Sequence, residues 1–233
     1  MPAPTWLVGE PNKGLAAMFT MMNYERLGVG VQGLAFSSYV AMQLDKSRYS
    51  EDAGERKRAE QLVALLTPVA KAFLTDMGLE ATLHGQQVFG GHGYIREWGQ
   101  EQLVRDCRIT RIYEGTNGIQ ALDLLGRKVL GTGGASAKTL IDEVLGFIRS
   151  APPTLAEFTA PLKAAVLNLE ELTDWILDRA KGDPNEVGAA SVEYLHVFGY
   201  TVYAYMWARM AHTALPKAGQ HDFYASKLGT ARF

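Results

Sequence analysis

Residues 111–130 read RIYEGTNGIQALDLLGRKVL and combine a glycine-flanked turn with the start of a helix. Thr116 and Asn117 are both good N-cap residues, because their side-chain oxygens can accept a hydrogen bond from an amide of the first helical turn. Either cap predicts a helix that runs to Leu130. Glu114 is therefore expected on a turn immediately before a helix N-terminus.

Further helices are expected on the C-terminal side of this stretch. The glycine-rich linker GTGGASA (131–137) follows it, and the segments SAPPT (150–154) and GDPNE (182–186) interrupt the remaining helical pattern. The helices predicted between these breaks cover residues 137–149, 155–181, 184–213 and 222 onward.

Apolar residues also recur at helical spacing on the N-terminal side. Pro68 is expected to kink one of these helices, or to restart it with Thr67 as the cap. Only residues 6–8 suggest a strand, so the predicted fold class is all-α. The predicted helices cover residues 15–46, 55–76, 79–89 and 100–107, with loops at 45–55 and 92–99.

The composition argues against two broad classes of function. At 47% hydrophobic residues the chain can bury a sizeable core, and its net charge of −2 and pI near 6.2 give no sign of a nucleic-acid-binding protein. The apolar run at 197–208 is shorter than the roughly 20 residues of a transmembrane helix, so no membrane span is expected.

The single Cys107 excludes an all-cysteine zinc site, and no metal site is predicted. With no evident signal peptide, a cytoplasmic protein is expected.

Gly28, Gly30 and Gly33 match the G-x-G-x-x-G pattern of dinucleotide-binding proteins. That pattern requires a strand before the first glycine and a helix that begins there. Here the helical periodicity is already two turns long when the glycines occur, so close helix packing explains them better. A Rossmann fold is not expected.

The carboxylate of Glu114 has two interpretations. Taken alone, it is a favourable charge near a helix N-terminus. Gly115 beside it lets a ligand approach the backbone closely, and free amides of the first helical turn can bind an oxyanion. The turn would then offer a base together with backbone donors, which proton removal beside a carbonyl requires.

Several segments resemble acyl-CoA dehydrogenases, and the most specific combines QVFGGHGYIREW (87–98) with RDCRITRIYEGTNGIQALDLLGRKVL (105–130). GEPNKGLAAMFTMMNYERLGVGVQGLA (9–35) is also similar to the family. The C-terminal tail resembles the extension of a longer bacterial subgroup that includes 3-methylmercaptopropionyl-CoA dehydrogenases. The resemblance implies a stub of the middle β-domain, a helical bundle and a helical extension, at residues 1–14, 15–130 and 137–233.

This resemblance implies an FAD-dependent oxidation of a fatty acyl-CoA thioester, as in β-oxidation. Glu114 would remove the α-proton while a hydride leaves the β-carbon for the flavin, which gives a trans-2-enoyl-CoA. The Glu114 N–H and a ribityl hydroxyl would hold the thioester oxygen. Electrons would then pass to an electron-transfer flavoprotein.

The resemblance also implies binding residues. Gly115 would line the substrate site, and Arg26 would lie near the catalytic pocket. The flavin would lie close to Thr116, Asn117 and Gly118. A second cofactor segment would contact the FAD of a neighbouring subunit in a homo-oligomer, a dimer or tetramer, through Gln87, Val88, Phe89, Gly90 and Gly91.

Glu25 is a rival base, because some family members carry their catalytic glutamate at this position, before the helix arginine. The intact Y-E-G-T sequence favours Glu114. His84 and His92 lie near the cofactor segment, where a loop or capping role is favoured over catalysis. The four tryptophans are expected in the core or in an interface.

The chain also departs from the family pattern. The N-terminal helical domain and the middle β-domain have no counterpart apart from the stub, and a second gap falls near residues 39–47. The chain is therefore interpreted as a truncated form that need not be active alone. Two alternatives stay open: an acyl-CoA oxidase on the same scaffold, and a non-catalytic helical module that only assembles or binds another chain.

Overall fold

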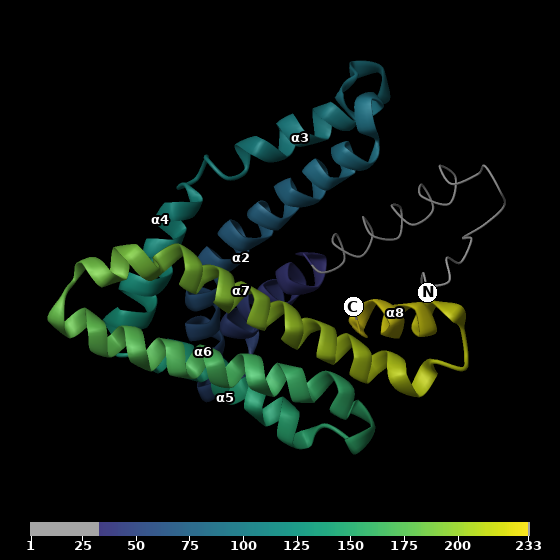
Figure 1. The fold of residues 1–233 in the computed structure, drawn as a ribbon. Coiled ribbons are helices and arrows are strands. Elements are labelled where there is room, and N and C mark those ends of the chain that lie inside the picture. The colour runs from purple at the N-terminus through teal and green to yellow at the C-terminus, as the bar shows by residue number, and fades with distance from the viewer. Residues whose placement is uncertain (1–32, 233) are drawn as a thin grey trace, which may run out of the picture.

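The computed structural model describes residues 33–232, and within them the chain forms helices and connecting turns without a strand (Figure 1). The prediction of an all-α fold therefore holds for this part of the chain. Several predicted features lie outside the described residues: the strand at 6–8, most of the first helix, Glu25, Arg26, Gly28 and Gly30.

The described chain begins in a helix that covers residues 33–49. The predicted helices from residue 100 onward are all present, each within two residues of its predicted bounds. The elements are, in chain order, α2 (Ala53–Val88), η1 (Gly90–Tyr94), η2 (Arg96–Trp98), α3 (Gln100–Ile109), α4 (Asn117–Leu122), the π-helical turn η3 (Asp123–Val129), η4 (Leu130–Thr132), α5 (Ala135–Ser150), η5 (Pro153–Leu155), α6 (Ala156–Gly182), α7 (Asn185–Ala214), η6 (Leu215–Lys217) and α8 (Asp222–Arg232).

α2 is one continuous helix of 36 residues, whereas the sequence predicts two helices with a break after Asp76. Pro68 lies buried inside it, and Thr67 is not a cap because its hydroxyl donates to the Val63 carbonyl at 2.7 Å. An internal proline costs about 3 kcal/mol. Burial of apolar side chains on both sides of the proline offsets this cost, since each contributes about 1.5–3 kcal/mol. The side chains concerned are Leu62, Leu65, Leu66, Val69 and Phe73.

By length and composition alone, α2 could also cross a membrane. The same properties are typical of a core helix, and α2 packs against α3, α4, α5 and α7. In Figure 1, α6 and α7 are long antiparallel neighbours, α5 lies along α6, and α3 returns beside the C-terminal half of α2. The long apolar α2 is thus explained by its place in the core of the described bundle.

Residues from both halves of the chain form a single hydrophobic cluster. Fully buried members come from α2, η3, α5, α6 and α7, for example Phe73, Leu125, Leu140, Val166 and Phe198. The helices after residue 135 therefore complete the core that α2 and η3 begin.

The closest approach of α2 and α7 depends on Gly199. A Cβ atom at this position would lie 2.4 Å from ring atoms of Phe73, which is too close for any real contact. The same ring makes edge-to-face contacts with Tyr200 and Tyr203, at centroid distances of 4.9 and 4.8 Å. Phe73 is therefore held on several sides and has no room to move away.

Gly199→Ala is expected to lower the free energy of unfolding by about 1–3 kcal/mol, because the added methyl overpacks the α2–α7 contact. Gly188→Ala on the same helix is the matched control, since a Cβ there meets no atom within 4 Å. The control should leave stability unchanged or raise it by up to about 1 kcal/mol. Urea unfolding followed by circular dichroism measures both variants, and equal stabilities would contradict the packing described here.

Candidate functional site

The turn before α4 has an unusual backbone. Glu114 has φ 54° and Gly115 has φ 86°, so both residues lie in the left-handed region. This region is strained for a side chain such as glutamate, and strain of this kind is concentrated at functional sites. The Asn117 N–H donates to the Arg111 carbonyl at 3.2 Å and closes the turn at its base.

Thr116 is the N-cap of α4, as the sequence allows, and its hydroxyl oxygen accepts from the Ile119 N–H at 3.4 Å. Two amides of the first helical turn, those of Asn117 and Ile119, are therefore already bonded within the protein and are not free oxyanion donors. The Glu114 N–H, by contrast, has no hydrogen-bond partner among residues 33–232. The Glu114 side chain is exposed.

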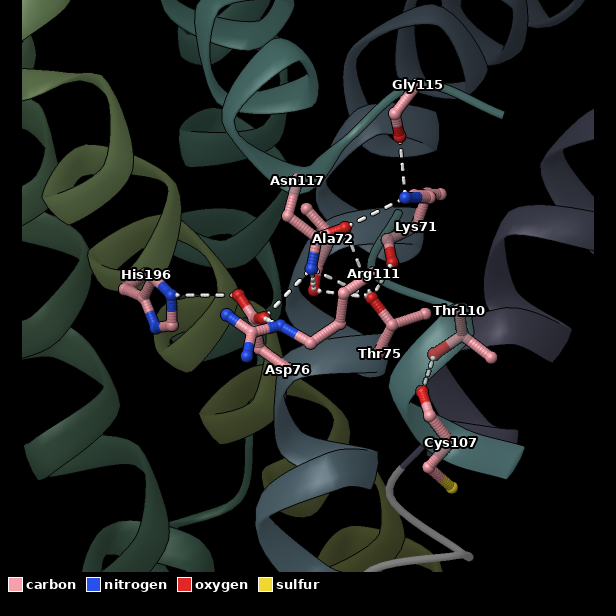
Figure 2. Close-up of polar contacts among 10 residues, drawn as sticks. All are labelled: Lys71, Ala72, Thr75, Asp76, Cys107, Thr110, Arg111, Gly115, Asn117 and His196. Carbon is pink, nitrogen blue, oxygen red and sulfur yellow. Dashed lines mark hydrogen bonds and ion pairs between the residues drawn. The ribbon is translucent and has the colours of Figure 1, made fainter. Parts of the chain in front are cut away.

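Asn117 fixes the far end of the turn to α2 (Figure 2). Its amide nitrogen donates to the Ala72 carbonyl, to the Thr75 hydroxyl and to Asp76 Oδ1, at 3.1, 3.0 and 2.8 Å. Its amide oxygen accepts from Lys71 Nζ at 2.9 Å. Because Lys71 can only donate and the Asp76 carboxylate can only accept, these partners also fix the orientation of the amide.

Lys71 binds the middle of the same turn. Its ammonium group donates to the Gly115 carbonyl at 2.7 Å. Partial burial lowers the pKa of Lys71, and the negative charges of Asp76 and Glu114 oppose this change. The turn thus carries the Glu114 carboxylate, and the Lys71 ammonium group that donates to its backbone lies nearby.

Asp76 is the centre of the cluster. One carboxylate oxygen accepts from Asn117 and forms an ion pair with Arg111 Nε, so this single oxygen contacts both ends of the turn. The other oxygen lies 3.2 Å from His196 Nε2 on α7. Figure 2 shows these groups converging on Asp76 from α2, from the turn and from α7. A carboxylate with a side chain only 12% exposed is stable when it is paired in this way.

The sequence predicts the turn itself but not Lys71, Asp76 or His196. The available signal is weak: Lys71 and Thr75 are four residues apart on a largely apolar helix, and Asp76 follows directly. Because the sequence predicts a helix break after Asp76, it does not indicate that Asp76 belongs to this cluster.

The second predicted cofactor segment lies apart from the turn. Gln87 and Val88 end α2, Phe89 follows, and Gly90 and Gly91 begin η1. Eleven residues of helix separate Gln87 from Asp76, which corresponds to roughly 16 Å. Within one chain, therefore, the structure does not bring this segment to Glu114.

Among residues 33–232, the polar and ring contacts of His84 and His92 are all with residues close in the sequence. His84 pairs with Glu80 on the next turn of α2, at 3.5 Å, and His92 packs edge-on against Trp98 with centroids 5.1 Å apart. Trp98 and Trp175 are 56% and 53% exposed, so a core position is wrong for both.

Large apolar side chains are exposed along η1, η2, α3, the turn and α4. Their exposed fractions range from 43% to 81%. Exposed apolar surface of this extent usually marks a binding or association site. The residues are Tyr94, Trp98, Leu103, Ile109, Ile112, Tyr113, Ile119 and Leu122.

Comparison with known proteins identifies the family of the chain. Residues 40–130 match the family described as acyl-CoA dehydrogenase, C-terminal domain, and residues 140–233 match the one described as acetyl-CoA dehydrogenase C-terminal like. The 3-methylmercaptopropionyl-CoA dehydrogenase of Ruegeria pomeroyi is 31% identical over 98% of this chain and 49% of the relative. The chain belongs to the acyl-CoA dehydrogenase family.

The butyryl-CoA dehydrogenase of Syntrophomonas wolfei is a second acyl-CoA dehydrogenase relative, 25% identical over 98% of this chain and 48% of its own length. The chain therefore spans about half the length of these relatives. The alignment with the Ruegeria protein extends over 291 positions, more than the 233 residues of the chain. That acyl-CoA dehydrogenase thus has internal segments that this chain lacks.

Two solved structures confirm the helical fold. The crystal structure of Caenorhabditis elegans ACDH-11 in complex with C11-CoA superposes with a TM-score of 0.70 and 18% identity, over 97% of this chain and 37% of that one. The apo form of Bd2924 gives a TM-score of 0.61 and 20% identity, over 87% and 35%.

Proposed function

We propose that the chain supplies the catalytic base of an FAD-dependent acyl-CoA dehydrogenase, which converts an acyl-CoA thioester to a trans-2-enoyl-CoA. The observation that carries the proposal is the exposed Glu114, held in left-handed backbone between the anchored Arg111 and Asn117. A base held in place before the substrate arrives needs no reorganisation during proton transfer. Relatives named for 3-methylmercaptopropionyl-CoA and butyryl-CoA support a thioester substrate.

The turn fits both parts of the reaction. The unpartnered Glu114 N–H would bind the thioester oxygen, and the Glu114 carboxylate would take the α-proton, which the polarised carbonyl makes more acidic. FAD, when bound, supplies the acceptor for the hydride that leaves the β-carbon. Gly115 has no side chain to obstruct a ligand, and the exposed Thr116 and Gly118 would face the flavin. Asn117 would act from beneath, since its amide is bonded to α2.

We further propose that the electrons pass to an electron-transfer flavoprotein and that the protein acts in the cytoplasm as a homo-oligomer. Oligomerisation would bring Gln87–Gly91 of one subunit to the flavin of another, because that segment lies far from the turn of its own chain. An acyl-CoA oxidase would instead reduce oxygen, so oxygen consumption distinguishes the two electron acceptors.

Glu114→Gln is expected to lower the rate of flavin reduction by roughly a hundredfold to ten-thousandfold, because glutamine cannot accept the proton. The substitution belongs in a fusion of this chain to the preceding half of the Ruegeria relative, which supplies the remaining domains. Binding of acyl-CoA should persist. Stopped-flow spectroscopy of flavin bleaching measures the rate.

Glu60→Gln is the matched control, because Glu60 is an exposed carboxylate on α2 away from the turn. It should leave the rate unchanged. Full activity of Glu114→Gln, with activity lost in Glu25→Gln, would transfer the role of base to Glu25 and overturn the assignment.

A helical assembly module remains the second candidate for the chain by itself. It is favoured by the exposed apolar residues along α3 and the turn, and by the fact that the chain spans half the length of its relatives. The few expected FAD contacts must offset the same loss of ligand freedom as a complete site, which amounts to several kcal/mol or more.

The isolated chain is therefore expected to bind FAD weakly or not at all, and to self-associate through its exposed apolar surface. The visible absorption spectrum of the purified chain reports bound flavin, and gel filtration with light scattering reports its mass. A yellow protein with one flavin per chain and a single monomeric species would refute this expectation.

A further inference from the structure

His196 reaches the candidate active site from the C-terminal half of the chain. It lies on α7, within the segment that matches the second family description, while Glu114 lies within the segment that matches the first. Its Nε2 atom is 3.2 Å from Asp76 Oδ2. The same carboxylate uses its other oxygen for Asn117 and Arg111. A single residue, Asp76, thus connects His196 to both ends of the turn.

The imidazole is held in place by aromatic neighbours. Its ring meets the Phe73 ring nearly edge-on, with centroids 5.8 Å apart and an interplanar angle of 76°. Tyr200, one turn further along α7, packs against both rings, with centroid distances of 6.4 Å to His196 and 4.9 Å to Phe73. Phe73 is fully buried and cannot yield. The orientation of the His196 ring toward Asp76 is therefore set by packing.

The contact has a consequence for the carboxylate. A carboxylate on a helix can rotate about its side-chain bonds, and rotation of Asp76 would break its contacts with Arg111 and Asn117. Pairing of Oδ2 with His196 fixes the plane of the group and directs Oδ1 to the turn. The left-handed backbone at Glu114 persists only while the surroundings hold it.

We propose that His196 is a positioning residue for Glu114, acting through Asp76. The C-terminal helices then take part in holding the candidate catalytic turn, in addition to completing the core. The catalytic meaning of this inference rests on the proposed function, but the effect on the turn can be measured without flavin or substrate.

Two substitutions separate the polar contact from the packing. His196→Phe keeps a ring against Phe73 and removes the nitrogen that faces Asp76. His196→Gln removes the ring and offers a side-chain N–H to the same carboxylate. Tyr203→Leu is the control, since it removes an equivalent ring contact with Phe73 but leaves the contacts of His196 and Asp76 in place.

Hydrogen exchange of this chain, measured by mass spectrometry, reports the stability of the turn through the amides of Asn117, Ile119 and Gln120. His196→Phe should raise exchange there about tenfold or more, as expected for loss of one contact to a charged group. Exchange in α5 and α6 should not change. His196→Gln should restore most of the protection, and Tyr203→Leu should leave the turn as in the unsubstituted chain.

Unchanged exchange in His196→Phe would overturn the proposal, and so would equal increases in the Phe and Gln variants or an equal increase in Tyr203→Leu. These outcomes are independent of the proposed function. If Glu114→Gln retains full activity in the fusion while the exchange results are as expected, the assignment of the base fails and the positioning of the turn stands. If Glu114→Gln is inactive and the exchange is unchanged, this inference alone fails.

Discussion

The carboxylate of Asp76 is the group on which the candidate active site depends. It binds Asn117 and pairs with Arg111, the residues at the two ends of the turn that carries Glu114. A strained residue such as Glu114 costs about 1–3 kcal/mol, and it persists only where its neighbours over-determine it. The anchoring carboxylate must itself be fixed in space, and the uninterrupted α2 and the His196 contact provide that rigidity.

The packing that supports Asp76 also joins the two halves of the chain. α4 follows the turn and continues into η3, which buries Leu125 in the cluster that α5, α6 and α7 complete. Gly199 allows α7 to approach Phe73 closely, and that approach places His196 beside Asp76. Core packing and site geometry thus share the α2–α7 contact. In this chain the C-terminal helices thus support the candidate turn from a second side.

The sequence predicts local features of this protein well and distant ones poorly. Helix bounds after residue 100, a cap at Thr116 or Asn117 and the turn at Glu114 follow from residue spacing and cap chemistry, which are local. The helix break predicted after Asp76 is wrong, because tertiary packing of α2 stabilises one continuous helix. The cluster around Asp76 could not be predicted, since its partners are far apart in the sequence and meet only after the helices pack.

A double-mutant cycle between Asp76 and Asn117 measures whether the Asp76 carboxylate holds the turn that carries Glu114. Free energies of unfolding are measured in urea for the unsubstituted chain, Asp76→Ala, Asn117→Ala and the double variant. The effects of the two substitutions on the free energy of unfolding are expected to be strongly non-additive, with a coupling energy of about 1–3 kcal/mol, because each removes the partner of the other. Additive effects, within about 0.5 kcal/mol, would show instead that the Asp76 carboxylate does not hold the turn.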